Sequence, residues 1–479
     1  MTDLLLISPH QPRTAEILRT ATGITQPLGI GYIAAYAGKK GYSVEILDND
    51  IEQLSDEEFK NRIREIKPLC AGLSVCTSSI NTSFHLARLI KEVDGKIKVF
   101  MGGVHPTILP ELILKNENVD MAVIGEGEET VTEILSALKA GKSFSGIRGL
   151  ACRNEAGETV FNGERELIEN LDSLPFPAYE LMPMGKYTLP ASRRMTAFNV
   201  ASLVTGRGCP YSCRFCSHNT VFRGRVRFRS PENVVDEMLH LRGKFGVGEF
   251  LFWDDSILLN RARALRLFGL IKKELPGIIW SASSRVDHLD EEMAEAMKTA
   301  GCRMLLFGVE SGSQKILDSI NKKTNLEQIR KAAGICKKTG ILSFCSFIIG
   351  TPEETEETVA ETKKFVLRLD PDYAIFCVFA PMPGSQYFRE LFEKGLLDPE
   401  RMDWDDYINL LSSRPPARTA CKLSRERLVE AQKDLFRSFY LRPSYIMKRF
   451  LMMRSPEHLR QNIRGALAVI KLQFNRFKK

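Results

Sequence analysis

Short apolar runs alternate with stretches of helical periodicity over the first 142 residues. The apolar runs have the length of single strands, and the stretches between them, such as 30–39 and 84–93, repeat apolar residues at helical spacing. This alternation is typical of a doubly wound parallel sheet, an α/β fold with helices on both faces. The predicted strands are 4–8, 43–48, 70–76, 97–102 and 119–124.

The same alternation recurs six times between residues 191 and 395. The predicted strands are 199–205, 249–253, 278–282, 304–309, 342–349 and 373–379, and amphipathic helices such as 231–245 and 291–300 separate them. Six such units predict an open, partial (β/α)6 barrel with its chemistry at the C-terminal ends of the strands. Residues 143–190, with a hairpin-like segment at 147–166 and the sequence Leu174-Pro175-Phe176-Pro177, form the predicted linker.

The remaining region, 396–479, has helical patterns at 404–411, 425–440 and 445–453. The last of these carries apolar and basic residues close together: Ile446, Phe450, Met453, Lys448, Arg449 and Arg454. From Arg414 onward there are 17 Lys and Arg against 4 Asp and Glu, so the first 413 residues carry a net charge of about −5. A basic amphipathic helix of this kind lies either on an anionic membrane surface or over the barrel mouth with a solvated rim. Nucleic-acid binding is not expected, because no recognised module accompanies the charge.

The overall composition indicates the class of protein and its cellular compartment. The chain has 479 residues, of which 44% are hydrophobic and 26% charged, as in globular proteins with more than one domain. No apolar run has the length needed to span a bilayer, and the start, Met1-Thr2-Asp3, lacks the positive region of a secretory signal. We therefore expect a cytoplasmic protein. Eleven cysteines in so long a chain do not suggest a disulfide framework, so a tight cysteine cluster indicates a metal site.

Such a cluster follows the first barrel strand, in the segment 206–216, where Cys209, Cys213 and Cys216 have CxxxCxxC spacing. Three thiolates on one glycine-containing loop can bind three irons of a [4Fe-4S] cubane and leave the fourth iron without a protein ligand. The amino and carboxylate groups of S-adenosylmethionine (SAM) can chelate that open iron. The alternative is a structural zinc site with His218 as the fourth ligand, but zinc knuckles usually come in pairs and no second one is present.

With this motif the chain is identified as a member of the radical SAM superfamily. The resemblance extends over the barrel and implies that one electron from the cluster cleaves SAM to methionine and a 5′-deoxyadenosyl radical. It also implies SAM contacts at the strand ends, from Phe215 in the cysteine loop, Asp254 or Asp255, Arg285, Glu310 and Gly350. The two aspartates would face the SAM amine, Arg285 its carboxylate, and Glu310 the ribose hydroxyls or the amine. Gly350 would allow a close approach on the adenine side of SAM. Alternatively, the acidic residues cap helices and Arg285 forms a structural salt bridge.

The predicted strand ends of the first domain resemble the cobalamin-binding domain of one large branch of this superfamily. The residues concerned are Gly102, Gly103, His105, Gly125 and Gly127, together with the segment 27–32. The resemblance implies a flavodoxin- or Rossmann-like sheet with cobalamin at the carboxyl ends of its strands. The Asp-x-His-x-x-Gly motif that supplies the lower cobalt ligand elsewhere is absent. Its place after the first strand reads Ser8-Pro9-His10-Gln11-Pro12, so the lower ligand is unassigned.

The resemblance as a whole implies a cobalamin-dependent radical SAM enzyme. Most such enzymes are C-methyltransferases acting on an unactivated carbon of a small-molecule, lipid or tetrapyrrole substrate, with electrons from a flavodoxin- or ferredoxin-type donor. Ring-forming or rearranging enzymes without methyl transfer share the same domains. A methylthiotransferase would need a second cluster from three N-terminal cysteines, for which Cys70, Cys76 and Cys152 are poorly placed. A non-enzymatic cofactor sensor would not need the open iron.

Overall fold

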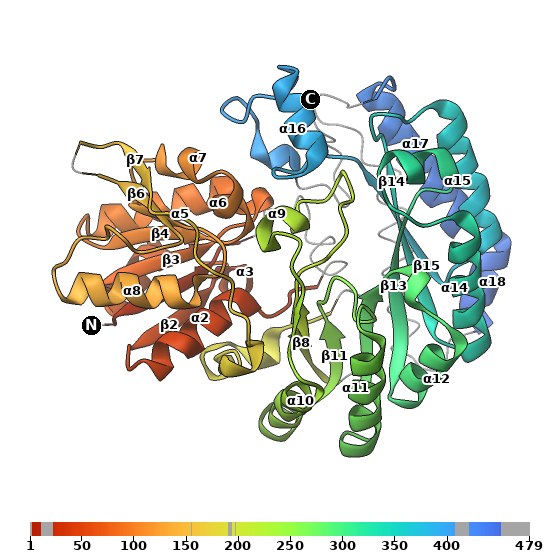
Figure 1. Cartoon of the computed structure of the whole chain (residues 1–479), viewed down its shortest axis with the longest axis horizontal. Coiled ribbons are helices and arrows are strands. Elements are labelled where there is room, and N and C mark those ends of the chain that lie inside the picture. Colours follow the sequence, from red (N-terminus) through yellow and green to blue (C-terminus); the bar gives the residue numbers. More distant parts are fainter. Residues whose placement is uncertain are drawn as a thin grey trace.

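The computed structural model describes residues 2–10, 23–154, 156–189, 194–196, 198–407 and 421–451. Two large sheets organise the molecule, and their domains lie side by side in Figure 1. The first domain is drawn in red to orange at the left, and the second, in green to blue-green, curls into an open half-barrel at the right. The predicted division into a doubly wound sheet and a partial barrel is confirmed.

The first sheet has the strand order β2-β1-β3-β4-β5-β6-β7. Its strands are β1 (Leu4–Ser8), β2 (Val44–Asp48), β3 (Cys70–Ser74), β4 (Lys98–Gly102), β5 (Met121–Val123), β6 (Leu150–Arg153) and β7 (Thr159–Phe161). The first five are parallel in the flavodoxin order, which reverses direction between β1 and β3. Ligands of such sheets bind beyond the carboxyl ends of the strands at that switch point.

The hairpin β6–β7 extends this sheet instead of bridging the domains. Sequence analysis placed the segment 147–166 in the linker, whereas Leu150 pairs with Val123 in an antiparallel ladder. The pairing has a simple cause, because β5 would otherwise end the sheet with a row of unpaired backbone groups. The exposed side chains of β7 then make the outer edge.

Helices cover both faces of the first sheet. One face packs against α2 (Leu28–Lys39) and α8 (Gly127–Lys139), and the other against α4 (Asp56–Ile66), α5 (Ile80–Val93), α6 (Val104–Ile108) and α7 (Pro110–Leu114). The short α3 (Asn49–Glu52) follows β2. Leu4 and Leu6 point to the first face while Leu5 and Ile7 point to the second, and all four are buried. This two-sided burial explains why β1 is a continuous apolar run.

The second sheet has the order β15-β14-β13-β12-β11-β8, all parallel, so each strand lies beside the next one in sequence. The strands are β8 (Asn199–Leu203), β11 (Val247–Phe252), β12 (Ile279–Ser284), β13 (Cys302–Glu310), β14 (Leu342–Ile349) and β15 (Tyr373–Val378). The helices on its outer face are α10 (Pro231–Phe245), α11 (Arg261–Glu274), α12 (Glu291–Thr299), α13 (Gln314–Ser319), α14 (Leu326–Thr339) and α15 (Glu356–Leu369). A half-barrel of six strands leaves two open edges, at β8 and β15.

A C-terminal helix, α17 (Arg425–Tyr440), covers the β15 edge. Gln432 Nε2 donates to the carbonyl oxygen of Phe376 at 2.7 Å. The hydroxyl of Tyr440 donates to the carbonyl of Ala374 at 2.6 Å and accepts from its N–H at 3.1 Å. Side chains of α17 thus replace the strand that a closed barrel would place here, so α17 is a structural helix.

The β8 edge is closed by the first domain. Gln26, which precedes α2, is 4% exposed. Its Oε1 accepts from the N–H of Ser202 at 2.9 Å, and its Nε2 donates to the carbonyl of Val200 at 3.0 Å. One buried amide therefore satisfies two backbone groups of the edge strand and ties the domains together.

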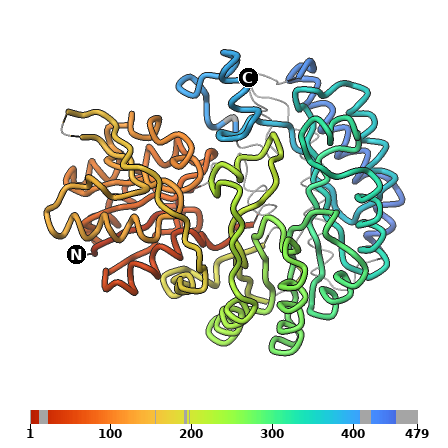
Figure 2. The backbone as a smooth tube through the Cα atoms, viewed as in Figure 1, coloured from red at the N-terminus to blue at the C-terminus, as the bar shows by residue number. Residues whose placement is uncertain are grey.

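The chain between β15 and α17 returns to the first domain. Figure 2 shows the segment around α16 (Gln386–Glu393) passing across the junction of the two domains. Trp404 then packs into the core of the first domain. Of the predicted helix 404–411, the structure describes Trp404–Tyr407, which form a 3-10 turn, and residues 408–411 lie outside the described part.

The last described helix is α18 (Pro443–Leu451), which confirms a helix close to the predicted 445–453. One face packs on the barrel through Tyr445, which is 6% exposed, and through Arg449, whose guanidinium carbon lies 3.9 Å from the ring centre of Tyr373. Arg449 is therefore not part of a solvated basic rim. Met453, Arg454 and the rest of the basic tail lie outside the described residues.

Candidate active site

The three motif cysteines lie on a loop between β8 and α10 that a small ladder closes at its base. The ladder pairs β9 (Gly206–Arg207) with β10 (Arg227–Phe228) in antiparallel register. Gly208 adopts φ +100°, and a Cβ there would lie 1.9 Å from the carbonyl oxygen of Arg225. Only glycine permits this approach of the two sides of the loop. The loop thus leaves the C-terminal end of the first barrel strand, where sequence analysis placed it.

The thiols of Cys209, Cys213 and Cys216 are partly buried. Burial raises the pKa of all three, to about 11 for Cys216. Burial thus disfavours the thiolates, and bound iron would supply the compensating positive charge. Within the described residues, no three Cys, His, Asp or Glu side chains converge on a single metal position. Thiolates that share a cubane each bind a different iron, so this donor set fits the predicted [4Fe-4S] cluster.

The two aspartates after β11 have different environments. Asp254 is 8% exposed and accepts from the N–H of Thr205 at 3.0 Å and from its hydroxyl at 2.8 Å. Burial raises its pKa to about 6 despite these bonds. Asp255 forms an ion pair with His218 at 2.8 Å. Burial is the main reason that the pKa of Cys209 is raised, and the negative charge of Asp255 raises it further. Of the pair, Asp255 is thus the one near the thiols, whereas Asp254 holds the end of β8.

His218, the alternative zinc ligand, is a helix-starting residue of α9 (His218–Phe222). Its Nε2 is the atom that pairs with Asp255 Oδ2. The imidazole is therefore committed to a carboxylate, and the geometry offers no support for its binding the same ion as the thiols.

Arg285 lies directly after β12 and is 7% exposed. Its Nε and Nη2 donate to the two oxygens of Asp287 at 3.0 and 2.9 Å, as the structural alternative from the sequence proposed. The guanidinium also lies 3.7 Å from the ring centre of Tyr211, inside the cysteine motif. Tyr211 in turn makes a 2.7 Å hydrogen bond with His288 Nε2. This stack holds the cysteine loop against β12, a role that sequence analysis did not assign to Tyr211.

Glu310 ends β13 with φ +67°, a strained conformation for a non-glycine residue. Its Oε1 accepts from Lys322 Nζ at 2.6 Å, and both side chains are less than a tenth exposed. Lys322 Nζ lies 5.9 Å from the ring centre of Phe215. Lys322 was not predicted from the sequence, because the run Asn321-Lys322-Lys323 between two helices resembles a solvated surface turn. The pair places one carboxylate and one ammonium group beside the cysteine loop.

Gly350 follows β14 with φ +91°. A Cβ there would lie 2.9 Å from Leu428 Cδ1 of α17, and its N–H donates to Glu354 Oε2 at 3.1 Å. The position where a side chain would be is therefore filled by the C-terminal helix. In this arrangement the glycine accommodates packing, and its assignment to the adenine side of SAM stays a prediction.

The first-domain glycines have two kinds of surroundings. Gly102 and Gly127 pack closely against Val123 and Ile33, and Gly103, at φ +106°, approaches the carbonyl oxygen of Val75. At Gly125, with φ +76°, a Cβ would meet nothing within 4 Å. Open space therefore lies beside Gly125 in the loop after β5, whereas the backbone at the other three glycines is closely packed.

His105 is fully buried in α6. Its Nδ1 lies 3.2 Å from the hydroxyl of Thr77, and its ring meets Trp404 edge-on at 4.8 Å between centroids. Burial lowers its pKa to about 4. Its Nε2 is buried without a hydrogen-bond partner among the described residues, as are Nε and Nη2 of Arg227 across the domain junction. These buried polar atoms without a partner belong to the two domains that meet here, and with the open space beside Gly125 they would suit a large polar cofactor such as cobalamin.

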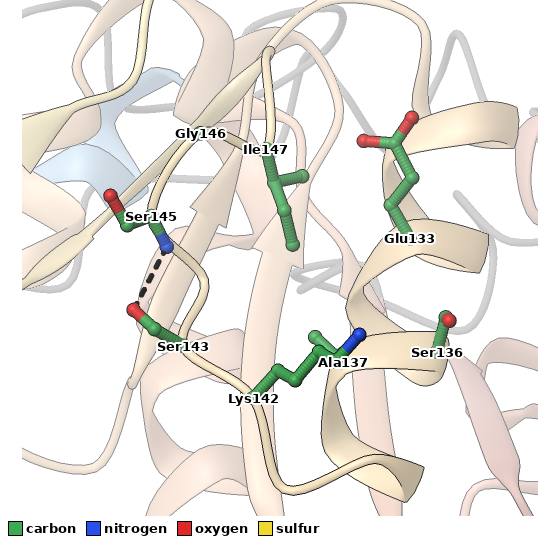
Figure 3. Close-up of a pocket in the computed structure, with 8 residues that line it drawn as sticks. All are labelled: Glu133, Ser136, Ala137, Lys142, Ser143, Ser145, Gly146 and Ile147. Atoms are coloured by element: carbon green, nitrogen blue, oxygen red, sulfur yellow. Dashed lines mark hydrogen bonds between the residues drawn. The ribbon is translucent and has the colours of Figure 1, made fainter.

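Two shallow surface hollows lie on α8, away from the cysteine loop. One, of about 330 Å³, is formed by the C-terminal half of α8 and the turn at residues 142–147 (Figure 3). There the N–H of Ser145 donates to Ser143 Oγ at 3.1 Å, and the charged lining residues are Glu133 from α8 and Lys142 from the turn. The motif Gly125-Glu126-Gly127-Glu128 begins α8, so this hollow lies at the other end of the helix and carries no cofactor assignment.

Two family models match this chain: the radical SAM superfamily over residues 203–366 and the B12 binding domain over residues 16–135. Among relatives, an uncharacterized methyltransferase of Pyrococcus horikoshii is 35% identical over 97% of this chain and 98% of its own length. An anaerobic magnesium-protoporphyrin IX monomethyl ester cyclase of Rubrivivax gelatinosus is 29% identical over 94% of this chain and 80% of its own. A cytidylyl-2-hydroxyethylphosphonate methyltransferase of Streptomyces wedmorensis is 29% identical over 78% of this chain and 79% of its own length.

Solved structures share the fold. The cobalamin-dependent SAM radical enzyme OxsB, with aqua-cobalamin and SAM bound, has a TM-score of 0.74 at 17% identity over 99% of this chain and 72% of its own. The radical SAM methyltransferase TsrM of Kitasatospora setae, with cobalamin and a [4Fe-4S] cluster bound, has a TM-score of 0.68 at 20% identity over 82% and 75%.

Proposed function

Because this chain belongs to the cobalamin-binding branch of the radical SAM superfamily, whose cofactors are a [4Fe-4S] cluster, SAM and cobalamin, we propose that it methylates an unactivated carbon of a small-molecule substrate. The observation that carries the proposal is that the loop after β5 and the cysteine loop after β8 are in direct contact. The loop after β5, open at Gly125, contacts the base of the cysteine loop after β8 through Glu126 and Arg207. Two cofactor sites at these loops would face one substrate space.

In the overall reaction, a substrate C–H and two SAM molecules, with two electrons from a flavodoxin- or ferredoxin-type donor, give a C–CH3 bond. One SAM leaves as S-adenosylhomocysteine, and the other as methionine and 5′-deoxyadenosine, which carries the substrate hydrogen. Cobalamin, when bound, relays the methyl group and the cluster supplies the electron that cleaves SAM.

The chain's own residues bind and orient these groups. Cys209, Cys213 and Cys216 would hold the cluster, with Phe215 between the last two thiols. Asp255 and Glu310 present carboxylates near the thiols for the SAM amine or ribose, and Lys322 offers an ammonium group for the SAM carboxylate. Gly125 would leave room for the corrin ring.

The relatives suggest the substrate class. Their names include a nucleotide-linked phosphonate methyltransferase, two bacteriochlorophyllide methyltransferases of Chlorobaculum tepidum and the magnesium-protoporphyrin cyclase. A tetrapyrrole is therefore a leading substrate candidate. The similarity to the cyclase extends over 94% of this chain. This favours ring formation without methyl transfer as the second candidate function.

Anaerobic reconstitution of the full chain with iron, sulfide and cobalamin tests the proposal. A panel of tetrapyrroles, lipids and peptides is incubated with SAM and a chemical reductant, and products are analysed by mass spectrometry. The expected result is a gain of one methyl group in a panel member, with S-adenosylhomocysteine and 5′-deoxyadenosine both formed. Single Ala variants of the three cysteines should abolish 5′-deoxyadenosine formation. A product lacking a new methyl group, with 5′-deoxyadenosine alone, would instead support the cyclase-type function.

We also propose that α18 contacts an anionic membrane surface in a cytoplasmic enzyme. Four apolar side chains of this helix are more than half exposed: Ile446, Met447, Phe450 and Leu451. They adjoin a basic tail whose positive charge would be attracted to anionic lipid. Within the described residues, no helix is long and apolar enough to cross a bilayer.

Co-sedimentation with anionic liposomes at low and high salt tests this contact. The intact protein is expected to bind at low salt and to be released at high salt, because exposed charges are screened beyond a Debye length of about 8 Å at physiological ionic strength. A Phe450→Ser variant should bind more weakly. Absence of binding by the folded, intact protein at low salt would contradict the proposal.

A further inference from the structure

A buried group of two arginines and two glutamates joins the two domains beside the cysteine loop. Arg207 and Arg227 lie opposite each other in the β9–β10 ladder, so together they form the neck of the loop that carries the three cysteines. Glu126 is the N-cap residue of α8, at the end of the loop after β5, and Glu128 lies in the first turn of α8. The four formal charges cancel, and no more than 14% of any of the four side chains is exposed.

One carboxylate holds both strands of the neck. Arg207 Nη1 donates to Glu126 Oε1 at 2.6 Å, and Arg227 Nη1 donates to Glu126 Oε2 at 2.7 Å. Arg207 Nη2 donates to Glu128 Oε1 at 2.7 Å. The planar guanidinium of Arg207 thus binds two carboxylates, one through each terminal nitrogen. This fixes the orientation of the Arg207 side chain as well as its distance from α8.

The surroundings keep this group charged and in place. Burial raises the pKa of Glu126, but hydrogen bonds from Arg227 and the charge of Arg207 outweigh it, so the pKa is lowered. The N–H of Ile168 donates to Glu126 Oε2 at 2.8 Å. The ring of Tyr32 on α2 lies 5.1 Å from the guanidinium carbon of Arg207. Three segments of the chain therefore converge on the neck of the cysteine loop.

We propose that Glu126 and Glu128 are positioning residues that set the geometry between the cluster and the cobalamin. The inference rests on the proposed function, in which a methyl group passes from SAM to the corrinoid domain. Arg207 is two residues from Cys209, and Glu126 adjoins the open loop at Gly125, so the bridge is a direct link between the two cofactor loops. Misplacement by about 1 Å can slow a reaction by 10²-fold.

A purely stabilising role is the competing explanation, because losing one partner of a buried ion pair leaves an uncompensated charge. The variants Glu128→Gln and Glu128→Gln/Arg207→Gln separate the two roles. The single variant leaves the buried group with one excess positive charge. The double variant restores neutrality but lacks the guanidinium of Arg207 that binds both carboxylates. Glu169→Gln is the matched control, because it removes the exposed ion pair with Arg225 on the same loop.

Each reconstituted holoenzyme is assayed for iron, bound cobalamin, 5′-deoxyadenosine, S-adenosylhomocysteine and the electron paramagnetic resonance spectrum of the reduced form. The spectrum reports the magnetic interaction between Co(II) and the reduced cluster, and hence their distance and orientation. For both Glu128 variants we expect wild-type iron and cobalamin, 5′-deoxyadenosine within twofold, at least a tenfold loss of S-adenosylhomocysteine and a changed magnetic interaction. Glu169→Gln should match the wild type throughout.

Recovery of S-adenosylhomocysteine in the double variant would overturn the inference, because charge balance alone would then explain the bridge. Wild-type spectra and S-adenosylhomocysteine in the single variant would overturn it as well. If Glu128→Gln loses iron or fails to fold, Glu128→Asp, which keeps the charge on a shorter side chain, replaces it, and loss of iron there too would show a merely structural role. If the wild type itself forms no S-adenosylhomocysteine, the proposed methyl transfer fails, while the magnetic interaction still tests the positioning.

Discussion

Gly208, the residue before Cys209, determines whether the cysteine loop can close at its base. Its φ of +100° lies beyond the narrow left-handed region that L-residues tolerate. A Cβ at this position would lie 1.9 Å from the carbonyl oxygen of Arg225 and 3.3 Å from Phe222 Cβ. A Gly208→Ala variant therefore meets both a backbone strain and a collision with the opposite side of the loop.

The size of the effect follows from these distances. An ordinary contact begins at 3.4 Å, so the Arg225 carbonyl would have to move by 1.5 Å. That shift exceeds what the two-residue ladder between β9 and β10 can absorb. The left-handed conformation alone costs an L-residue about 1–2 kcal/mol. We expect the loop to open while the six-stranded sheet, which does not include Gly208, stays folded.

Iron and sulfide analysis after anaerobic reconstitution measures the outcome. The wild type should hold about four irons per chain in a [4Fe-4S] cluster, and Gly208→Ala less than about one. Gly243→Ala is the control: Gly243 lies within α10, where a Cβ meets nothing within 4 Å, so this change should keep the iron and stabilise the helix by about 0.5–1 kcal/mol. A Gly208→Ala protein with about four irons and wild-type 5′-deoxyadenosine formation would refute this account of the loop.

Three further outcomes are expected. Phe439→Ala, at a fully buried ring of α17, should cost about 3–5 kcal/mol in urea denaturation and speed hydrogen exchange in β15, whereas Phe450→Ala, at a ring 66% exposed, should cost less than about 1 kcal/mol. His105 has its pKa lowered by burial from 6.5 to about 4, so the folded form stays neutral where the unfolded chain binds a proton. Stability should thus fall by up to about 3 kcal/mol as pH drops from 6.5 to 4, and His105→Gln should flatten that part of the denaturation profile. The paramagnetic resonance spectrum of the Co(II) form should lack splitting from a protein imidazole, because His10 pairs with Asp50 and His105 is buried. A nitrogen splitting that disappears in His10→Ala or His105→Ala would contradict this prediction.

The sequence by itself determined the elements whose signals are local. The strand 342–349 and the helices 231–245 and 425–440 were predicted with the bounds that the structure has. Each helix begins after a serine whose side chain accepts a backbone N–H, Ser230 and Ser424, and the first ends at a left-handed glycine, Gly246. Such signals lie within a few residues of each other, so they survive in the sequence alone. The CxxxCxxC motif belongs to the same category, because its chemistry follows from spacing.

Only the tertiary structure decided which members of a motif face the site and which support the fold. Asp254 and Asp255 are neighbours in sequence, yet one binds Thr205 just after the adjacent strand β8 and the other pairs with His218 beside the thiols. The space beside Gly350 is filled by Leu428, from a helix that begins 75 residues later, at Arg425. Glu126 bridges two arginines that lie 81 and 101 residues further along the chain. Strand alternation and loop closure determine the direction of a side chain, and both depend on partners that are distant in sequence and meet only when the two sheets dock.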